Sequence, residues 1–237
     1  APHRPVQPDP MFDGVYQGAT FLKPANYGRE FGQHFSRQSR QGRQYERFDS
    51  WGYRDQYDEV MAKYHQLVYG VDVAVGMIME AVQRAAVADN TVIIFTSDNG
   101  YFCGSHGYGS KVLPYEEGSR VPLIIVDPRH ANSGRNIRCQ EITGSTDFAP
   151  TILDLAGVRI PRNIDGRSLL PLYDQPQKPI HESLQLINVW GPAACHSFAV
   201  VTKQHKYIYW PWEEDDFKPT EEMYDIPNDP LELVNIA

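Results

Sequence analysis

Cysteine is scarce in this sequence, with three residues, Cys103, Cys139 and Cys195, among 237. So small and odd a number excludes a disulfide framework and permits one bridge at most. Long apolar runs are missing as well, because none approaches the roughly 18 residues that a membrane-spanning helix needs. Hydrophobic residues make up 41% of the chain and charged residues 22%, which excludes wholesale disorder. We expect one large domain, or a domain and a half, with a substantial core.

An excess of basic charge is also missing, because the formal net charge is −8. Residues 210–237 hold nine acids and one base, a difference that accounts for all of this charge. The sequence therefore presents no general surface for nucleic acid. The acidic tail is interpreted as a solvated face.

The N-terminal 53 residues are rich in proline, glycine, arginine and glutamine and show little periodicity. Between Phe31 and Arg47, four arginines stand among glutamines. This segment is interpreted as a long surface loop. The alternative is that it binds an acidic partner.

Helical and strand patterns alternate through the middle of the chain. Apolar residues at helical spacing, from Val60 to Val82, predict a helix over residues 54–86 whose apolar face packs in the core. The short β-branched run at residues 91–96 predicts a buried parallel strand, and residues 121–126 predict a second buried strand. Residues 147–156 predict a short helix that ends at Gly157. This alternation is typical of an α/β fold.

The pattern changes near residues 176–179, where prolines flank a polar stretch. Residues 197–202 and 206–210 alternate around a short turn, which predicts an antiparallel hairpin. We therefore predict an α/β domain over residues 1–175 and a smaller α+β domain with an antiparallel sheet over residues 176–237.

A possible site for chemistry follows the first predicted strand. Asp98 and Asn99 come directly after it, and open α/β sheets bind ligands at the carboxyl ends of their strands. The two side chains offer hard oxygen ligands for Ca²⁺ or Mg²⁺. The alternative is that Asn99-Gly100 forms an ordinary turn. Residues 100–111 contain four glycines and end at Lys111, and a metal with a lysine is one way to hold sulfate or phosphate.

Single residues of this loop also allow other interpretations. Lys111 by itself is also consistent with a solvated surface lysine, and His106 with an ordinary loop histidine. Cys103 and His106 have the spacing of half a zinc site, but no second half lies nearby in the sequence.

Several blocks together resemble the type I sulfatases, which have the alkaline-phosphatase-like fold. The blocks stand in the family's order across nearly the whole chain. They are Ala1–Pro5, Thr96–Gly100, His106-Gly107 with Lys111, Tyr115–Leu123, Ser145–Val158, Asp165–Leu172 and Tyr224–Leu233. The resemblance implies a mixed sheet sandwiched by helices, a small second domain, and a secreted, periplasmic or lysosomal protein.

The resemblance also implies roles for individual residues. Asp98 and Asn99 match two metal ligands, usually for Ca²⁺, with Mg²⁺ possible. Lys111 matches the lysine that binds the sulfate and assists the leaving oxygen. His3 matches a histidine on the other side of the sulfate, and His106 a histidine near the substrate. Around them, Glu117 and Arg120 are expected to brace the loop.

Two family elements are missing from these 237 residues. The nucleophile of the family is a formylglycine made in a Cys/Ser-x-Pro/Ala-x-Arg motif, and no cysteine or serine here has that context. The early Asp-Asp metal pair is also missing, since Asp215-Asp216 lies in the acidic tail. Both elements precede the His3 block in the family. The resemblance therefore implies the later part of a sulfatase, which depends on an upstream segment of the same protein and is inactive without it.

Two other functions remain open at this point. The first is hydrolysis of phosphate or phosphonate esters on the same fold, and the second is a catalytically dead fragment that binds sulfated glycan. Trp190, Trp210 and Trp212, with the arginines of residues 37–47, are candidates to line a site for a sulfated sugar. The alternative for the tryptophans is packing in the core.

Overall fold

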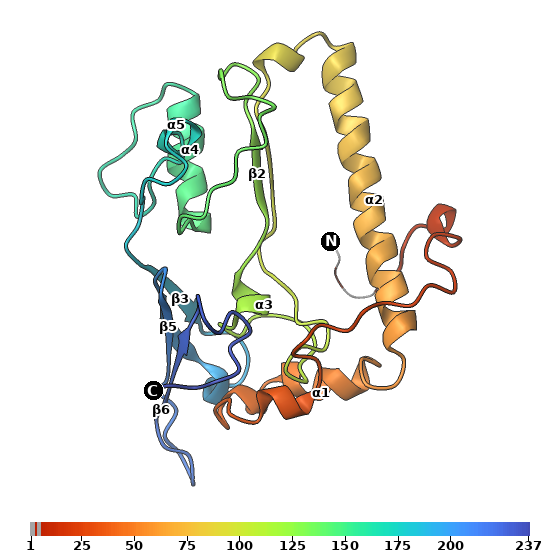
Figure 1. The fold of residues 1–237 in the computed structure, drawn as a ribbon, viewed down its shortest axis with the longest axis vertical. Coiled ribbons are helices and arrows are strands. Elements are labelled where there is room, and N and C mark those ends of the chain that lie inside the picture. Colours follow the sequence, from red (N-terminus) through yellow and green to blue (C-terminus); the bar gives the residue numbers. More distant parts are fainter. Residues whose placement is uncertain (1–2, 4–5) are drawn as a thin grey trace.

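The computed structural model describes residue 3 and residues 6–237 (Figure 1). It has five α-helices among these residues: α1 (Arg43–Ser50), α2 (Tyr57–Arg84), α3 (Glu116–Ser119), α4 (Phe148–Leu155) and α5 (Pro171–Asp174). The strands are β1 (Ile93–Thr96), β2 (Leu123–Val126), β3 (Leu184–Asn188), β4 (Ser197–Val201), β5 (His205–Trp210) and β6 (Thr220–Asp225). Within the described part of the chain, no helix has both the length and the hydropathy needed to cross a membrane.

Helix α2 confirms the predicted helix, but its expected burial is wrong over much of its length. Tyr57 and Met61, in its first two turns, are buried. Farther along, Met77 is 64% exposed and Ile78 is 59% exposed. Helical spacing identifies the apolar face of a helix, but it does not show whether another part of the same chain covers that face.

Strands β1 and β2 form an antiparallel pair, so the prediction of a buried parallel strand at residues 91–96 is wrong. Ile93 lies opposite Val126 and Thr96 lies opposite Leu123. The connecting segment returns on itself as a compact loop, and this reversal makes the two strands antiparallel. Within the described residues no other strand joins this pair. The expected mixed sheet sandwiched by helices is therefore not present there as such.

The arginine-rich segment is not a surface loop, which corrects the interpretation of residues 31–47. It forms short 3₁₀ turns and helix α1, and Phe35, Gln38 and Gln44 are buried. The Ser36 N–H donates to Glu222 Oε1 over 2.7 Å, and Gln38 Nε2 donates to the Lys218 carbonyl over 2.6 Å. Contacts to the distant C-terminal residues satisfy its polar groups and allow its burial.

The C-terminal region confirms the predicted antiparallel hairpin and extends it to four strands in the order β3-β4-β5-β6. It also corrects the interpretation of the acidic tail. Glu222, on β6, and Glu232 are fully buried. Lys206 Nζ lies 2.8 Å from Glu232 Oε1 and 2.6 Å from Glu116 Oε1. Two of the nine acids therefore belong to the interior, where buried charges require partners.

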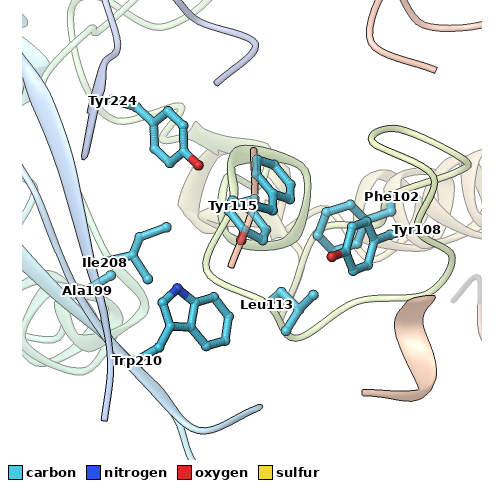
Figure 2. Close-up of a cluster of buried hydrophobic side chains, with 9 residues drawn as sticks. Phe102, Tyr108, Leu113, Tyr115, Ala199, Ile208, Trp210 and Tyr224 are labelled. Carbon is cyan, nitrogen blue, oxygen red and sulfur yellow. The ribbon is translucent and has the colours of Figure 1, made fainter. Parts of the chain in front are cut away.

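The largest core cluster joins this sheet to the glycine-rich loop (Figure 2). Ile208 and Trp210 of β5 face Tyr115 and Leu113, which directly follow the loop. The packing alternative is confirmed for Trp210, which is fully buried, whereas Trp190 is 54% exposed. This cluster crosses the predicted boundary between residues 175 and 176, and the boundary itself stays a prediction.

Candidate functional site

The glycine-rich segment forms a closed loop, which we call the lysine loop and define as residues 100–112. At its base, the Phe102 N–H donates to the Ser110 carbonyl over 2.8 Å. Nearer its tip, the Gly104 N–H donates to the Tyr108 carbonyl over 3.0 Å. These bonds place Lys111 at the base, on the same side as the end of β1, and place the residues around His106 at the tip.

His106 is fully buried at the tip of this loop. Its Nδ1 lies 2.9 Å from the Phe31 carbonyl, and its Nε2 lies 2.8 Å from Asn26 Nδ2. The His106 N–H donates to the Asn26 carbonyl over 2.6 Å. Both ring nitrogens thus have partners within the protein, and the structure separates this ring from Lys111. The contacts are those of an anchor for the loop.

Glu117 completes this buried network. Asn26 Nδ2 donates to Glu117 Oε1 over 2.6 Å. Burial by itself raises the pKa of Glu117, but the interactions with His106 and Asn26 outweigh it, and the pKa is lowered. The expectation that Glu117 braces the loop agrees with these contacts. By contrast, the Arg120 side chain is 72% exposed and its Nη1 lies 3.7 Å from Glu116 Oε2.

His106, Glu117 and Glu232 also offer ligand atoms that lie within 4.8 Å of one another. Their surroundings argue against a metal ion there. The Asn26 amide lies between His106 and Glu117, and Glu232 accepts from the Glu116 N–H and pairs with the Lys206 ammonium. A cation would have to displace the Asn26 amide and compete with the Lys206 ammonium, which already contact these groups.

The residues at the base of the lysine loop are more accessible. Asp98 is exposed, and Asn99 is half-buried with its Nδ2 donating to the Gly100 carbonyl over 2.9 Å. This bond leaves the Asn99 amide oxygen for another partner. The Asp98 carboxylate and this oxygen fit Ca²⁺ chemically, but they are too few for a cation that takes six to eight oxygens. The two residues therefore fit as part of a larger ligand set.

Lys111 is half-buried, and its backbone is held from α1. Gln44 Nε2 donates to the Lys111 carbonyl over 2.9 Å. In the described part of the chain, the Lys111 ammonium has no hydrogen-bond or ion-pair partner. The charge is thus available to an anion at the base of the loop.

The remaining predicted residues are placed as follows. His3 is exposed, but its neighbours at positions 1–2 and 4–5 lie outside the described residues, so its role stays a prediction. Cys103, Cys139 and Cys195 are free thiols. Burial raises the pKa of Cys103 to about 12, which makes it a poor nucleophile.

Two contributors to this region escaped sequence reasoning. Asn26 and Gln44 carry no sequence signal of their own, since each is a single polar residue in the N-terminal part of the sequence, which shows little periodicity. In the structure Gln44 lies on α1. Their partners, His106 and Lys111, lie 80 and 67 residues away.

Two models of known protein families match this chain. The family model for sulfatases matches residues 7–158. The model for the C-terminal part of N-sulphoglucosamine sulphohydrolase matches residues 104–237. Both matches include the lysine loop from residue 104 onward.

Two curated proteins are similar in sequence to about three quarters of this chain. An N-acetylglucosamine-6-O-sulfatase of Bacteroides thetaiotaomicron is 34% identical over 76% of this chain and 32% of its own length. Arylsulfatase K of Bos taurus is 30% identical over 75% of this chain and 33% of its own. The chain thus spans about a third of the length of these relatives.

Solved structures extend the likeness to the fold. The structure of BT4656 in complex with its substrate D-glucosamine-2-N,6-O-disulfate has a TM-score of 0.84 and 26% identity, covering 100% of this chain and 59% of that one. A phosphonate monoester hydrolase of Agrobacterium radiobacter has a TM-score of 0.65 and 26% identity, covering 77% of this chain and 38% of that one.

Proposed function

The chain belongs to the sulfatase family, and we propose that it forms the anion-binding part of a sulfuric ester hydrolase. The observation that carries the proposal is the base of the lysine loop. There the Lys111 ammonium, which has no partner among residue 3 and residues 6–237, follows the same strand end as Asp98 and Asn99. The proposed substrate is a sulfated carbohydrate or an aryl sulfate. A sulfated glucosamine is favoured, because relatives are an N-acetylglucosamine-6-O-sulfatase and a protein solved with a glucosamine disulfate.

The residues divide the proposed reaction between them. Asp98 and Asn99 would hold Ca²⁺, or Mg²⁺, together with further oxygen ligands. When bound, the ion supplies positive charge to the oxygens of the sulfate ester. Lys111 binds a sulfate oxygen and donates a proton toward the leaving alcohol oxygen. His3 would contact the sulfate from the other side.

The nucleophile is proposed to come from elsewhere in the same protein. These 237 residues contain no Cys/Ser-x-Pro/Ala-x-Arg motif, so the proposed formylglycine and the early metal ligands belong to an upstream segment. We therefore expect no turnover and only weak Ca²⁺ binding from the 237 residues alone. Turnover of nitrophenyl sulfate by this purified chain would contradict the proposal.

The central test uses the longer protein that contains this chain and the formylglycine motif. We expect Lys111→Ala to reduce hydrolysis of the sulfate ester by at least about 100-fold. Its unfolding midpoint should stay unchanged, because the ammonium has no protein partner among the described residues.

The matched variant is His106→Asn, at the tip of the same loop. It should lower the unfolding midpoint, because it removes bonds to Phe31 and Asn26. A catalytic His106 would instead give loss of turnover at unchanged stability.

A second candidate function is hydrolysis of phosphonate or phosphate esters, which the structural likeness to a phosphonate monoester hydrolase favours. Comparing nitrophenyl sulfate, nitrophenyl phosphate and a nitrophenyl phosphonate on the longer protein distinguishes the two. A protein that turns over none of them yet binds sulfated glycan would be the catalytically dead alternative.

A further inference from the structure

The backbone around Lys111 is held in an unfavourable conformation. Ser110 has φ +71° and Val112 has φ +96°, and Lys111 stands between them. Positive φ is uncommon outside glycine, and for a β-branched residue such as valine it is an outlier. Such a backbone persists only where surrounding contacts determine it, and it is frequent at functional sites.

Besides the Phe102 bond to the Ser110 carbonyl, contacts from one short helix hold this backbone. Gln44, on α1, is buried; its Nε2 donates to the Lys111 carbonyl over 2.9 Å, and its own carbonyl accepts from the Gly109 N–H over 2.8 Å. Arg47 Nη1 donates to Ser110 Oγ over 2.9 Å. Three consecutive residues of the loop are thus bonded to α1.

The close approach of α1 depends on the glycine at position 109. A Cβ atom added to Gly109 would lie 2.9 Å from the carbonyl carbon and the carbonyl oxygen of Arg47. Only glycine therefore allows the helix to reach the loop here. In this position of α1, the Gln44 amide faces the carbonyl of Lys111, whose side chain is proposed to bind the sulfate.

We propose that Gln44 is the positioning residue for Lys111: it holds the strained backbone so that the ammonium meets the leaving oxygen of the sulfate ester. This inference rests on the proposed function. It adds a residue that contacts neither substrate nor metal and that acts through the Lys111 carbonyl.

The proposal is tested first on the 237-residue chain by hydrogen exchange. Gln44→Met keeps the size of the side chain and removes its donor. We expect amide exchange at Phe102 and Gly109 to become about fivefold to tenfold faster. The reason is that the variant loses the hydrogen bond from Gln44 Nε2 to the Lys111 carbonyl. Gln41→Met is the matched control, because Gln41 is exposed and its side-chain Nε2 donates to the Arg37 carbonyl, outside the lysine loop. Equal exchange in both variants would overturn the proposal.

The second test separates positioning from a general loss of structure, using the longer protein. A sugar alkoxide needs a proton as it leaves, whereas a nitrophenolate does not. We therefore expect Gln44→Met to reduce kcat by about tenfold for glucosamine 6-sulfate and by less than about twofold for nitrophenyl sulfate. A variant that merely lowers the amount of folded protein reduces both by the same factor, and that result would overturn the inference.

Failure of the inference and failure of the proposed function give different results. The inference alone is overturned if the wild-type longer protein hydrolyses sulfate esters and the Gln44→Met variant is as active as the wild type on both substrates. A wild-type protein that hydrolyses neither ester overturns the proposed function and, with it, the positioning role of Gln44.

Discussion

Two regions of this molecule bury their apolar residues to very different degrees. The packed region comprises residues 26–50, the lysine loop with α3, and the sheet β3–β6, and it contains the largest core cluster. The open region comprises α2 and the β1–β2 pair, and Figure 1 shows α2 on the side of the molecule away from strands β3, β5 and β6. There Phe95, Ile124 and Val126 are exposed although each lies on a strand.

The difference shows where this chain supplies its own partners. In the packed region, segments far apart in sequence close around one another, so apolar and charged groups are both covered. In the open region, the later turns of α2 and the strand face that carries Phe95 and Ile124 lack a covering layer within the described residues. The opposite face of β2 is covered, because Leu123 and Ile125 pack against a small core cluster. Exposed apolar faces that extend over several residues normally contact another part of a protein or a partner.

The largest expected effect comes from removing a central aromatic of the packed region. Trp210→Ala should lower the free energy of unfolding by about 3–5 kcal/mol, because the fully buried indole leaves a cavity. Trp190→Ala is the matched change at an exposed position and should stay within about 0.5 kcal/mol. Urea denaturation of both variants measures the difference, and equal values would abolish the distinction between buried and exposed tryptophan.

The buried ion pair should give the next largest effect. Lys206→Met leaves the carboxylates of Glu232 and Glu116 without their ammonium, and we expect a loss of about 3 kcal/mol in the free energy of unfolding. Lys203→Met, three residues earlier, breaks a pair with Glu141 whose lysine is partly exposed, and should cost about 1 kcal/mol or less. A Lys206→Met variant as stable as Lys203→Met would show that the pair contributes nothing.

The buried carboxyls of the packed region predict a pH dependence. Burial raises the pKa of Glu232 to about 7, since it outweighs the attraction of Lys206, and burial also raises the pKa of Glu222. The folded state therefore holds protons that the unfolded chain releases near pH 4.5. This contribution to stability is complete below pH 4.5 and is lost as the pH rises toward 7 and above.

Glu222→Gln isolates one of these groups. It keeps the side-chain shape and has no proton to release, so the fall in unfolding midpoint between pH 4.5 and 7 should be smaller than in the wild type. Equilibrium unfolding across that range measures it. An unchanged slope would mean that Glu222 titrates alike in the folded and unfolded chains.

The smallest effect is expected in the open region. Ile78→Gln on α2 should change the free energy of unfolding of this chain by no more than about 0.5 kcal/mol, because the side chain is already exposed. In the longer protein that we propose, the same change should cost about 1–3 kcal/mol if another segment covers α2. A similar small value in both would show that this face of α2 stays solvated.

Local elements were predictable because their signals are local. The spacing of Val60 to Val82 predicts α2, and the alternation around Lys203 predicts the β4–β5 hairpin. The Asp98-Asn99 strand end and the glycine-rich run to Lys111 could be found for the same reason. The direction of β1 relative to β2 could not, since it depends on how the loop between them folds back.

The interior of the site was less predictable because its contacts are distant in sequence. His106 and Lys111 lie five positions apart in one loop, yet contacts with Asn26 and Gln44 assign them to an anchored tip and an accessible base. Lys206 and its partner Glu116 are 90 residues apart. The sequence around Lys206 and the acidic composition of the tail that contains Glu232 therefore gave no sign that these charges are buried.

The sequence by itself determined the family of this protein, its main helix and hairpin, and the identity of the residues proposed to bind metal and sulfate. The helix and the hairpin follow from spacing within short segments, whereas the family and the residue roles follow from the resemblance of motif blocks along the chain. Tertiary structure alone decided which charges are buried, which histidine anchors a loop, and which glutamine holds the lysine. Burial and hydrogen bonding are properties of the whole fold, because each partner comes from a segment that the chain brings close only when it folds.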